Sequence, residues 1–194
     1  MHLIDSNPIR KLWIVEAHLY RDHLLRLDPE SRRNRFGGAV SDEFIRSYAE
    51  PRRLAGIVIH GFFVGGVLRG AAELRSLPTG HAADVAFSIE KPWQSRGVGT
   101  ALLERTLLAA RNRRVKFLHM TCLADNRRMR QLARKYHAQL KVDFGTAVGE
   151  VEAPHPTAMS LFRELVADGV GLVTGVLDVQ SRLLDAASLV GRCA

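Results

Sequence analysis

The sequence predicts an α/β (α+β) fold, with a mixed, mostly antiparallel central sheet flanked by helices and a C-terminal helical extension. Three observations lead to this prediction. Apolar residues recur with helical spacing over residues 16–48, and short apolar segments rich in Val, Ile and Phe are separated by tight turns over residues 56–89. From residue 98 onwards, helical and strand-like patterns alternate.

Composition limits the class of protein further. The chain has 194 residues, of which 46% are hydrophobic, and 28 Lys plus Arg against 20 Asp plus Glu give a net charge of +8. This length can bury a core without staples. The two cysteines, Cys122 and Cys193, lie far apart, so neither a disulfide framework nor a cysteine zinc site is expected. No apolar run reaches about 18 residues, so we expect a cytoplasmic protein without a membrane span.

The positive charge favours an anionic partner, such as nucleic acid or a polyphosphate ligand, although an Arg-rich surface can also serve solubility alone. Poor interleaving of aromatic and basic residues makes nucleic acid the weaker choice. No metal site is expected.

Three helices are expected before the sheet. The first covers residues 16–27, where leucines follow helical spacing. The second starts after Asp28, an N-cap residue followed by Pro29 at the first helical position, and ends before Gly37. The third starts after Ser41, which is a second N-cap.

A three-strand meander is expected next. Its strands are residues 56–63, 67–74 and 82–89, joined at Gly65-Gly66 and at Pro78-Thr79-Gly80.

The second half of the domain starts with a helix at Val98, followed by a strand over residues 117–122. Asp125 is expected to cap a further helix, whose apolar stripe runs to Leu140. A final strand is expected within residues 142–151.

A Pro-containing linker at Pro154 is expected to separate a main domain, residues 1–153, from a helical extension, residues 154–194. The extension carries helical patterns over residues 157–167 and 172–190. The apolar stripe of the second pattern is consistent either with a cap on the core or with a homodimer contact.

The segment of residues 94–100 (Gln-Ser-Arg-Gly-Val-Gly-Thr) lies between a predicted strand and a predicted helix. A helix N-terminus presents unpaired backbone N–H groups and the positive end of the helix dipole, which together bind phosphate. Glycines let the backbone approach the anion. A tight turn without a ligand is the alternative. The third glycine of a dinucleotide loop and the Gly-Lys-Ser/Thr of a triphosphate loop are absent from this stretch.

This segment resembles the acyl-CoA-binding signature of the GNAT N-acetyltransferases, Gln/Arg-x-x-Gly-x-Gly/Ala, at Gln94, Gly97 and Gly99. The preceding strand, residues 83–89, is similar to the fourth strand of that family, and Asn126-x-x-Met129-x-x-Leu132 is similar to its Asn-x-x-Ala/Met-x-x-Leu pattern. By element order the resemblance covers about residues 12 to 145. The early segment of residues 25–36 looks most like the GNAT domain of Pat-type protein lysine acetyltransferases.

The resemblance implies a GNAT-like sheet and acetyl-CoA as cosubstrate. Phe87 and Ile89 would offer backbone groups to the pantetheine arm, and Asn126 would hydrogen-bond it near the thioester. The residues implied in cofactor binding are Phe87, Ser88, Ile89, Gln94, Ser95, Arg96, Gly97, Val98, Gly99, Thr100 and Asn126. One or two basic residues of the helix after Asn126 would meet the 3′-phosphate.

The resemblance also implies catalytic candidates. Asp84 stands where the Pat-like pattern has a Glu, ten residues before Gln94, so it is the first candidate for the general base, acting through a water because its arm is shorter. Glu73 in the neighbouring strand is the second. The family's frequent Tyr acid falls at Ala133 here, which leaves Tyr136, one turn later, as the candidate acid. His119, Cys122 and His137 are more often packed or solvated in such positions.

The function predicted from these residues is acetyl transfer from acetyl-CoA to a primary amine, with a protein lysine as the first acceptor class. A small-molecule amine and a non-catalytic acyl-CoA-binding module remain as alternatives, the latter because the Tyr is missing and an Asp replaces the Glu.

Overall fold

The computed structural model of the chain describes residues 8–78, 80–143, 145–152, 157 and 159–169. Within them, seven strands form one sheet in the order β1-β2-β3-β4-β5-β7-β6. Only the β4–β5 pair of this described sheet is parallel, so the mixed, mostly antiparallel sheet is confirmed. The strands are β1 (Ile9–Lys11), β2 (Val58–Val64), β3 (Val67–Ser76), β4 (Ala82–Ile89), β5 (Phe117–Leu123), β6 (Gln139–Asp143) and β7 (Thr146–Glu152).

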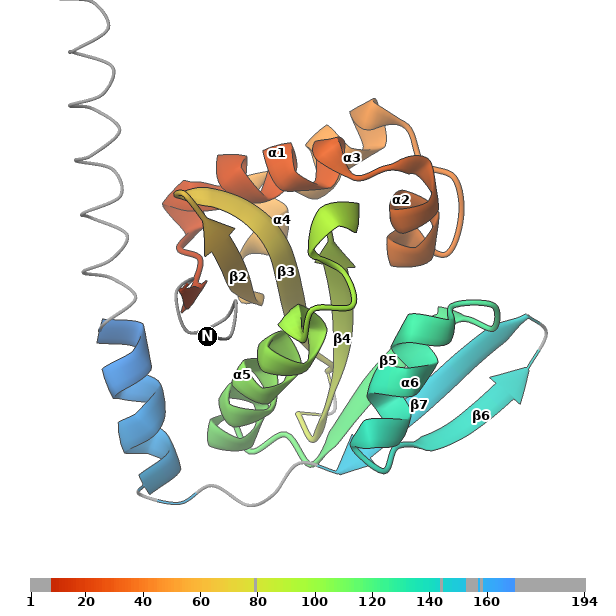
Figure 1. Cartoon of the computed structure of the whole chain (residues 1–194). Coiled ribbons are helices and arrows are strands. Elements are labelled where there is room, and N and C mark those ends of the chain that lie inside the picture. The colour runs from red at the N-terminus through yellow and green to blue at the C-terminus, as the bar shows by residue number, and fades with distance from the viewer. Residues whose placement is uncertain (1–7, 79, 144, 153–156, 158, 170–194) are drawn as a thin grey trace, which may run out of the picture.

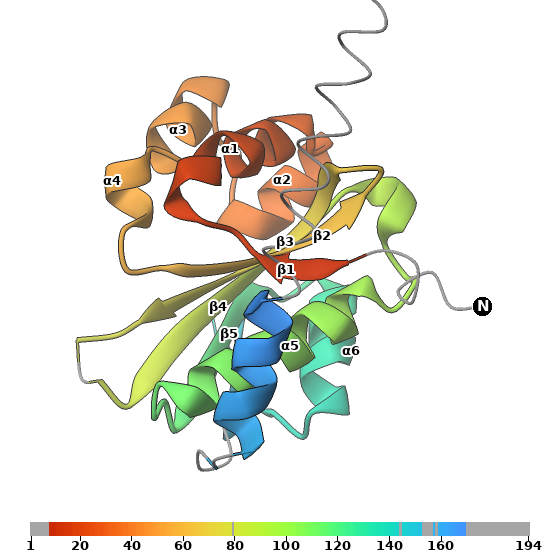
Figure 2. The ribbon, with the colours of Figure 1, turned by 90° about the vertical axis from the view of Figure 1, so that its left-hand side faces the viewer.

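Helices cover both faces of the sheet (Figure 1). Figure 2 shows the first four helices on one side and α5 and α6 on the other. The helices are α1 (Ala17–Arg26), α2 (Pro29–Phe36), α3 (Asp42–Tyr48), α4 (Pro51–Leu54), α5 (Val98–Asn112) and α6 (Arg127–Lys135), with short 3₁₀ turns at η1 (Ile14–Glu16) and η2 (Lys91–Trp93).

The helix ends expected before the sheet are confirmed in detail. Asp28 accepts a hydrogen bond from the backbone N–H of Ser31 at the start of α2, and Ser41 accepts one from Phe44 at the start of α3, each at 3.1 Å. Gly37 ends α2 with a φ of 75°, a left-handed conformation that favours glycine.

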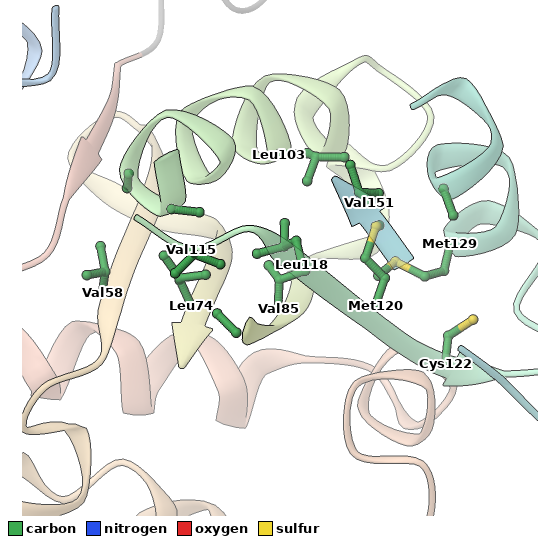
Figure 3. Packing of buried hydrophobic residues seen from close by; sticks show 14 of the residues in the cluster. Val58, Leu74, Val85, Leu103, Val115, Leu118, Met120, Cys122, Met129 and Val151 are labelled. Carbon is green, nitrogen blue, oxygen red and sulfur yellow. The ribbon is translucent and has the colours of Figure 1, made fainter. Parts of the chain in front are cut away.

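Each face of the sheet has its own core. Under α5 and α6, Leu103 packs with Leu118 and Met120 of β5, all at most 1% exposed (Figure 3). Under α1 and α3, Tyr20 and Leu24 pack onto β2 and β3. Because strand residues alternate between faces, this division fixes which side chains of β4 and β5 face α1 and α2.

Two predictions about elements are corrected, and two short elements were not predicted. The single strand expected over residues 142–151 is instead the end of β6 and most of β7, an antiparallel hairpin. The helix expected to reach Leu140 ends at Lys135, because His137 adopts a φ of 55° and turns the chain into β6. The three-residue β1 and the single turn α4 carry too little periodicity to be predicted.

A helix over residues 159–169 follows the sheet and is drawn beside α5 in Figure 2. Its contacts with α5 are polar: the Asn112 amide donates to the Ser160 carbonyl at 3.0 Å and to Glu164 at 2.6 Å, and Arg105 pairs with Asp168. Its apolar side chains, including Phe162 at 60% and Leu165 at 72% exposure, point away from this contact.

The second predicted helical stretch, residues 172–190, lies outside the described residues, so the homodimer contact expected of it stays a prediction. No described helix is long and apolar enough to cross a bilayer. The described part of the chain also holds no group of three or more His, Cys, Asp or Glu side chains suited to a metal.

Candidate active site

A groove of about 310 Å³ runs between α2, the end of β4, the start of α5 and one side of α6. All residues predicted to bind the cofactor line it except Arg96 and Val98. The groove therefore joins segments that are far apart in the sequence, and Phe87, Ser88 and Ile89 are the residues of β4 that line it.

The backbone of the loop before α5 has a geometry suited to holding an anion. Ser95 and Gly97 both adopt left-handed conformations, with φ of 57° and 84°, and these turn the chain into the helix. The first hydrogen bond of α5 runs from the Ala101 N–H to the Gly97 carbonyl at 3.1 Å. The N–H groups of residues 98–100 therefore have no partner within the helix and carry its positive dipole end.

Three residues of the predicted loop have side chains that contact other parts of the protein. Gln94 donates from Nε2 to the Ile89 carbonyl at 2.8 Å and to Ser31 Oγ at 2.9 Å, which ties the loop to β4 and α2. The Arg96 guanidinium lies over the Trp93 ring, 5.6 Å from its centroid. Val98 is 1% exposed, and its side chain is part of the core.

Strands β4 and β5 separate next to this groove. They pair in parallel over only three residue pairs, the last of which is Asp84 with His119. Beyond that pair β4 continues to Ile89 without β5 beside it. Among the described residues, this side of β4 has no strand partner there, so its peptide groups can pair with a ligand that lies along the strand, except for the Ile89 carbonyl, which accepts from Gln94.

Asn126 caps α6, because its Oδ1 accepts a hydrogen bond from the Met129 N–H at 3.1 Å. The prediction that Asp125 caps this helix is wrong: Asp125 forms an ion pair with Arg33 at 3.0 Å instead. Asn126 also lines the groove, and capping through Oδ1 leaves its amide N–H groups as donors.

Two basic residues of α6, Arg128 and Lys135, line the groove together with Asn126. The sequence shows a crowd of basic residues on this helix but not which of them face the groove. Ser31 and Asn34 of α2 also line it. They had no signal of their own, since α2 meets β4 only through the tertiary fold.

The three catalytic candidates are not brought together. Asp84 lies on β4 with its side chain 52% exposed, on the face of the sheet that α1 and α2 share. Glu73 is buried on β3, where it pairs with Arg35 at 2.8 Å and accepts hydrogen bonds from Tyr20 and Tyr48. Tyr136 donates from its hydroxyl to Glu104 of α5 at 2.9 Å.

These surroundings act on the titrating groups. Burial alone would raise the pKa of Glu73, but the Arg35 charge and the tyrosine hydrogen bonds outweigh it and hold that pKa below its usual range. Burial and the hydrogen bond to Glu104 raise the pKa of Tyr136. Neither change suits the role proposed from the sequence, since Glu73 becomes a weaker base and Tyr136 a weaker acid.

Asp84 has a neighbour that sequence reasoning set aside. His119 of β5 lies 3.7 Å from Asp84, from Nδ1 to Oδ1, and 3.2 Å from Glu150 of β7, from Nε2 to Oε2. Only the register of three strands places these side chains together.

A sheet opened beside a helix N-terminus with free N–H groups is the arrangement of a protein that can bind an elongated phosphorylated ligand along a strand. Residues 22–138 match the model of the acetyltransferase (GNAT) family, and the chain belongs to that family. It is an acyl-CoA-dependent N-acetyltransferase, and acetyl-CoA is its cosubstrate.

Solved structures with the same fold include the GNAT domain of PAT from S. lividans, with 22% identity, a TM-score of 0.63, and coverage of 74% of this chain and 89% of that one. YncA from Salmonella typhimurium, solved with its cofactor acetyl-CoA, shares 17% identity at a TM-score of 0.57, covering 79% and 97%. The PaiA N-acetyltransferase of Thermoplasma acidophilum, solved with coenzyme A, shares 18% identity at 0.59, covering 76% and 99%.

Proposed function

We propose that the chain transfers the acetyl group of acetyl-CoA to the side-chain amine of a protein lysine. The observation that carries this proposal is the open position of Asp84, half-exposed on the sheet face where β4 and β5 separate. A lysine on the surface of another protein can reach such a carboxylate from solvent, whereas an enclosed pocket would admit only small amines.

The cosubstrate would lie along the groove. Its pyrophosphate would accept hydrogen bonds from the N–H groups of residues 98–100, and its pantetheine arm would follow the unpaired side of β4 at Phe87 and Ile89. Asn126 would donate to that arm near the thioester, while Arg128 and Lys135 would face the 3′-phosphate. A backbone N–H of β4 would stabilise the oxyanion, because a fixed dipole costs no reorganisation during the reaction.

The acceptor must lose a proton first, because an ordinary lysine with a pKa of about 10.4 is protonated at neutral pH. Asp84 is the better placed carboxylate for this task, since Glu73 is enclosed by Arg35 and two tyrosines. The short Asp side chain acts through an intermediate group. The thiolate of coenzyme A leaves readily, which reduces the need for a separate acid such as Tyr136.

Cosubstrate binding is tested first by thermal unfolding with acetyl-CoA. At about 100 times the dissociation constant, the ligand adds about 2.7 kcal/mol to the stability of the folded state. Gly97→Glu places a carboxylate at the anion site and should abolish this gain. A gain of equal size in the folded variant would place the cosubstrate elsewhere.

Acceptor class is tested by acetyl transfer to an Nα-acetylated lysine peptide and to spermidine. We expect transfer to the peptide, lost in Asp84→Asn and kept in the control Asp22→Asn, whose carboxylate is exposed on α1. Turnover of spermidine alone would replace the protein lysine by a small-molecule amine. Normal turnover in Asp84→Asn, with unchanged acetyl-CoA affinity, would remove Asp84 from the reaction.

A further inference from the structure

A row of polar side chains crosses the sheet at the point where β4 and β5 separate. Strand register places Asp84 directly opposite His119, and His119 directly opposite Glu150. Ser88 contacts His23 of α1, and Asp84 lies four residues earlier on the same strand. Because strand side chains alternate between the two faces, Asp84 faces the same side of the sheet as Ser88. The row therefore lies on the face of the sheet that α1 and α2 share, away from α5 and α6. This is the face from which we expect the acceptor to approach.

The hydrogen bond to Glu150 fixes the tautomer of His119. A carboxylate only accepts hydrogen bonds, so the His119 Nε2 atom, 3.2 Å from Glu150 Oε2, carries the proton. In the neutral imidazole the other nitrogen, Nδ1, then holds a lone pair. Nδ1 faces Asp84 Oδ1 at 3.7 Å, beyond hydrogen-bond distance.

Within the described residues no protein donor is bonded to either of these two acceptors, and both side chains are open to solvent. An ammonium group carries three donors and a positive charge, so it satisfies both acceptors at once. The alternative is a proton on Nδ1, which turns His119 into a cation beside two carboxylates. The same pair of atoms is therefore suited both to holding a protonated amine and to receiving its proton.

We propose that His119 is the catalytic base of this enzyme: Asp84 holds the acceptor ammonium, and His119 Nδ1 takes its proton, while Glu150 fixes the tautomer. This proposal rests on the proposed function and makes His119, and not Asp84, the group that receives the proton. It deepens that proposal because it adds a side chain to the reaction and specifies a cationic acceptor.

The proton and electron balance is complete. One proton moves from the ammonium to His119 Nδ1, and the amine nitrogen then bonds to the thioester carbonyl carbon. The C–S bond breaks as the tetrahedral intermediate collapses. The second proton of the attacking nitrogen leaves with the thiolate to give the free thiol, and the imidazolium returns its proton to solvent.

An imidazole suits this step better than a carboxylate. An ordinary imidazole, with a pKa of about 6.5, holds a proton more firmly than an ordinary aspartate carboxylate at about 3.9. A base whose pKa lies near the working pH is the more effective one. Asp84 and Glu150 then act by position, because Asp84 lies beside Nδ1 and Glu150 accepts the hydrogen bond from Nε2.

The tautomer and the ammonium site are tested by NMR on the ¹⁵N-labelled full chain, with the His119 signals assigned from His119→Gln. We expect a proton on Nε2 and a free Nδ1. Methylammonium should shift the Nδ1 signal, and tetramethylammonium, which has the same charge but no N–H donor, should not. Asp84→Asn should abolish the response. A proton on Nδ1, or the same response or none from both cations, overturns the proposal.

Kinetics test the base itself. His119→Ala should lower kcat for the lysine peptide by about 10²- to 10⁴-fold, the range of general base catalysis, with little change in KM for acetyl-CoA. Added imidazole should restore part of the rate, an effect that a purely structural residue would not show. The control is His18→Ala, whose imidazole is exposed on α1 and contacts only a nearby carbonyl.

The outcomes separate the two proposals. A wild-type rate in His119→Ala, or a loss that imidazole does not rescue, removes His119 as the base while the acceptor class stands. If the wild type is stabilised by acetyl-CoA but acetylates neither the peptide nor spermidine, the proposed acceptor class falls. In that case the NMR experiment still decides whether His119 and Asp84 form the ammonium site.

Discussion

Arg35 of α2 and Glu73 of β3 form an ion pair that is closed to solvent on both sides. Their Nη2 and Oε2 atoms lie 2.8 Å apart, and their side chains are 6% and 4% exposed. Tyr20 and Tyr48 donate to the same carboxylate at 2.9 and 2.7 Å. One buried carboxylate thus connects α1, α2 and α3 to the sheet, which holds α2 in place as a wall of the groove.

Replacement of Glu73 by Gln should act on stability and not on the chemistry. The change leaves the Arg35 charge buried without its partner, and breaking such a pair costs about 3–5 kcal/mol. Urea unfolding should show this loss, while acetyl-CoA should still stabilise the folded variant. The control Glu30→Gln, on the exposed side of α2, should change little. Full stability with lost turnover would instead return Glu73 to the list of bases.

Gly99→Ala should show separately how an added methyl group affects the stability of the fold and the binding of acetyl-CoA. An added Cβ would lie 3.5 Å from Ile89 and 3.8 Å from Leu132, which are ordinary contacts with two groove residues. Alanine is also a better helix former than glycine by about 0.5–1 kcal/mol. The variant should unfold at the same temperature or higher, yet gain less from acetyl-CoA in thermal unfolding.

Gly38→Ala is the matched control for this change, since a Cβ there meets nothing within 4 Å and lies outside the groove. It should leave the acetyl-CoA effect intact. An undiminished effect in Gly99→Ala would mean that the ligand does not approach this part of α5.

His60 should make the protein less stable as the pH falls below about 6.5. Burial lowers the pKa of His60 to about 3, so the folded state keeps it neutral. The unfolded chain takes up this proton near pH 6.5 and gains stability relative to the folded state as the pH decreases. Each such histidine costs up to about 1.4 kcal/mol per pH unit. Burial also lowers the pKa of His23, although Glu90 offsets part of this.

The measurement is urea unfolding at several pH values between 5 and 7.5, above the usual titration of carboxylates. The free energy of unfolding of the wild type should fall with decreasing pH at a slope that corresponds to the uptake of up to two protons on unfolding. For His60→Leu the slope should correspond to up to one proton. The leucine leaves Thr106 bonded to the Leu102 carbonyl, so no new buried polar group is stranded. His18→Ala should keep the wild-type slope, and an equal slope in His60→Leu would contradict the assignment.

Asn112→Ala should loosen the helix over residues 159–169 without disturbing the groove. Asn112 makes hydrogen bonds to Ser160 and Glu164, and the apolar side chains of that helix add little because they face solvent. Chymotrypsin should therefore cleave at Phe162 faster in the variant. The stabilisation by acetyl-CoA should be unchanged. The control variant Lys116→Ala, changed at an exposed residue shortly after α5, should be cleaved at the wild-type rate. Equal cleavage rates in all three would show that other contacts hold the helix.

The sequence predicted those elements whose signals lie in neighbouring residues. N-caps at Asp28 and Ser41, the meander and the loop at Gly97 depend on neighbouring residues, and all are found where they were predicted. The hairpin of β6 and β7 was missed because its turn interrupts a segment too short for two clear alternating patterns. Asp125 and Asn126 are equally good caps by residue type, and only the structure shows that Asn126 accepts from the Met129 N–H while Asp125 pairs with Arg33.

Roles that depend on distant residues were harder to predict. Glu73 reads as a half-buried strand carboxylate, and only the fold shows that two tyrosines and Arg35 enclose it. His119 looked like a lone strand histidine. Its partners come from β4 and β7, and a shift of one residue in either register would have placed them on the opposite face.

The short parallel contact between β4 and β5 also has a mechanical consequence. Within the described residues, three residue pairs are the whole backbone ladder between β1–β4 and β5–β7. Local opening starts where backbone pairing is sparse, so the Phe117 amide, which donates to the His81 carbonyl just before β4, should exchange with deuterium sooner than the amides of the long β2–β3 ladder. A ligand that contacts both β4 and β5 would hold the two halves of the sheet together and slow that exchange.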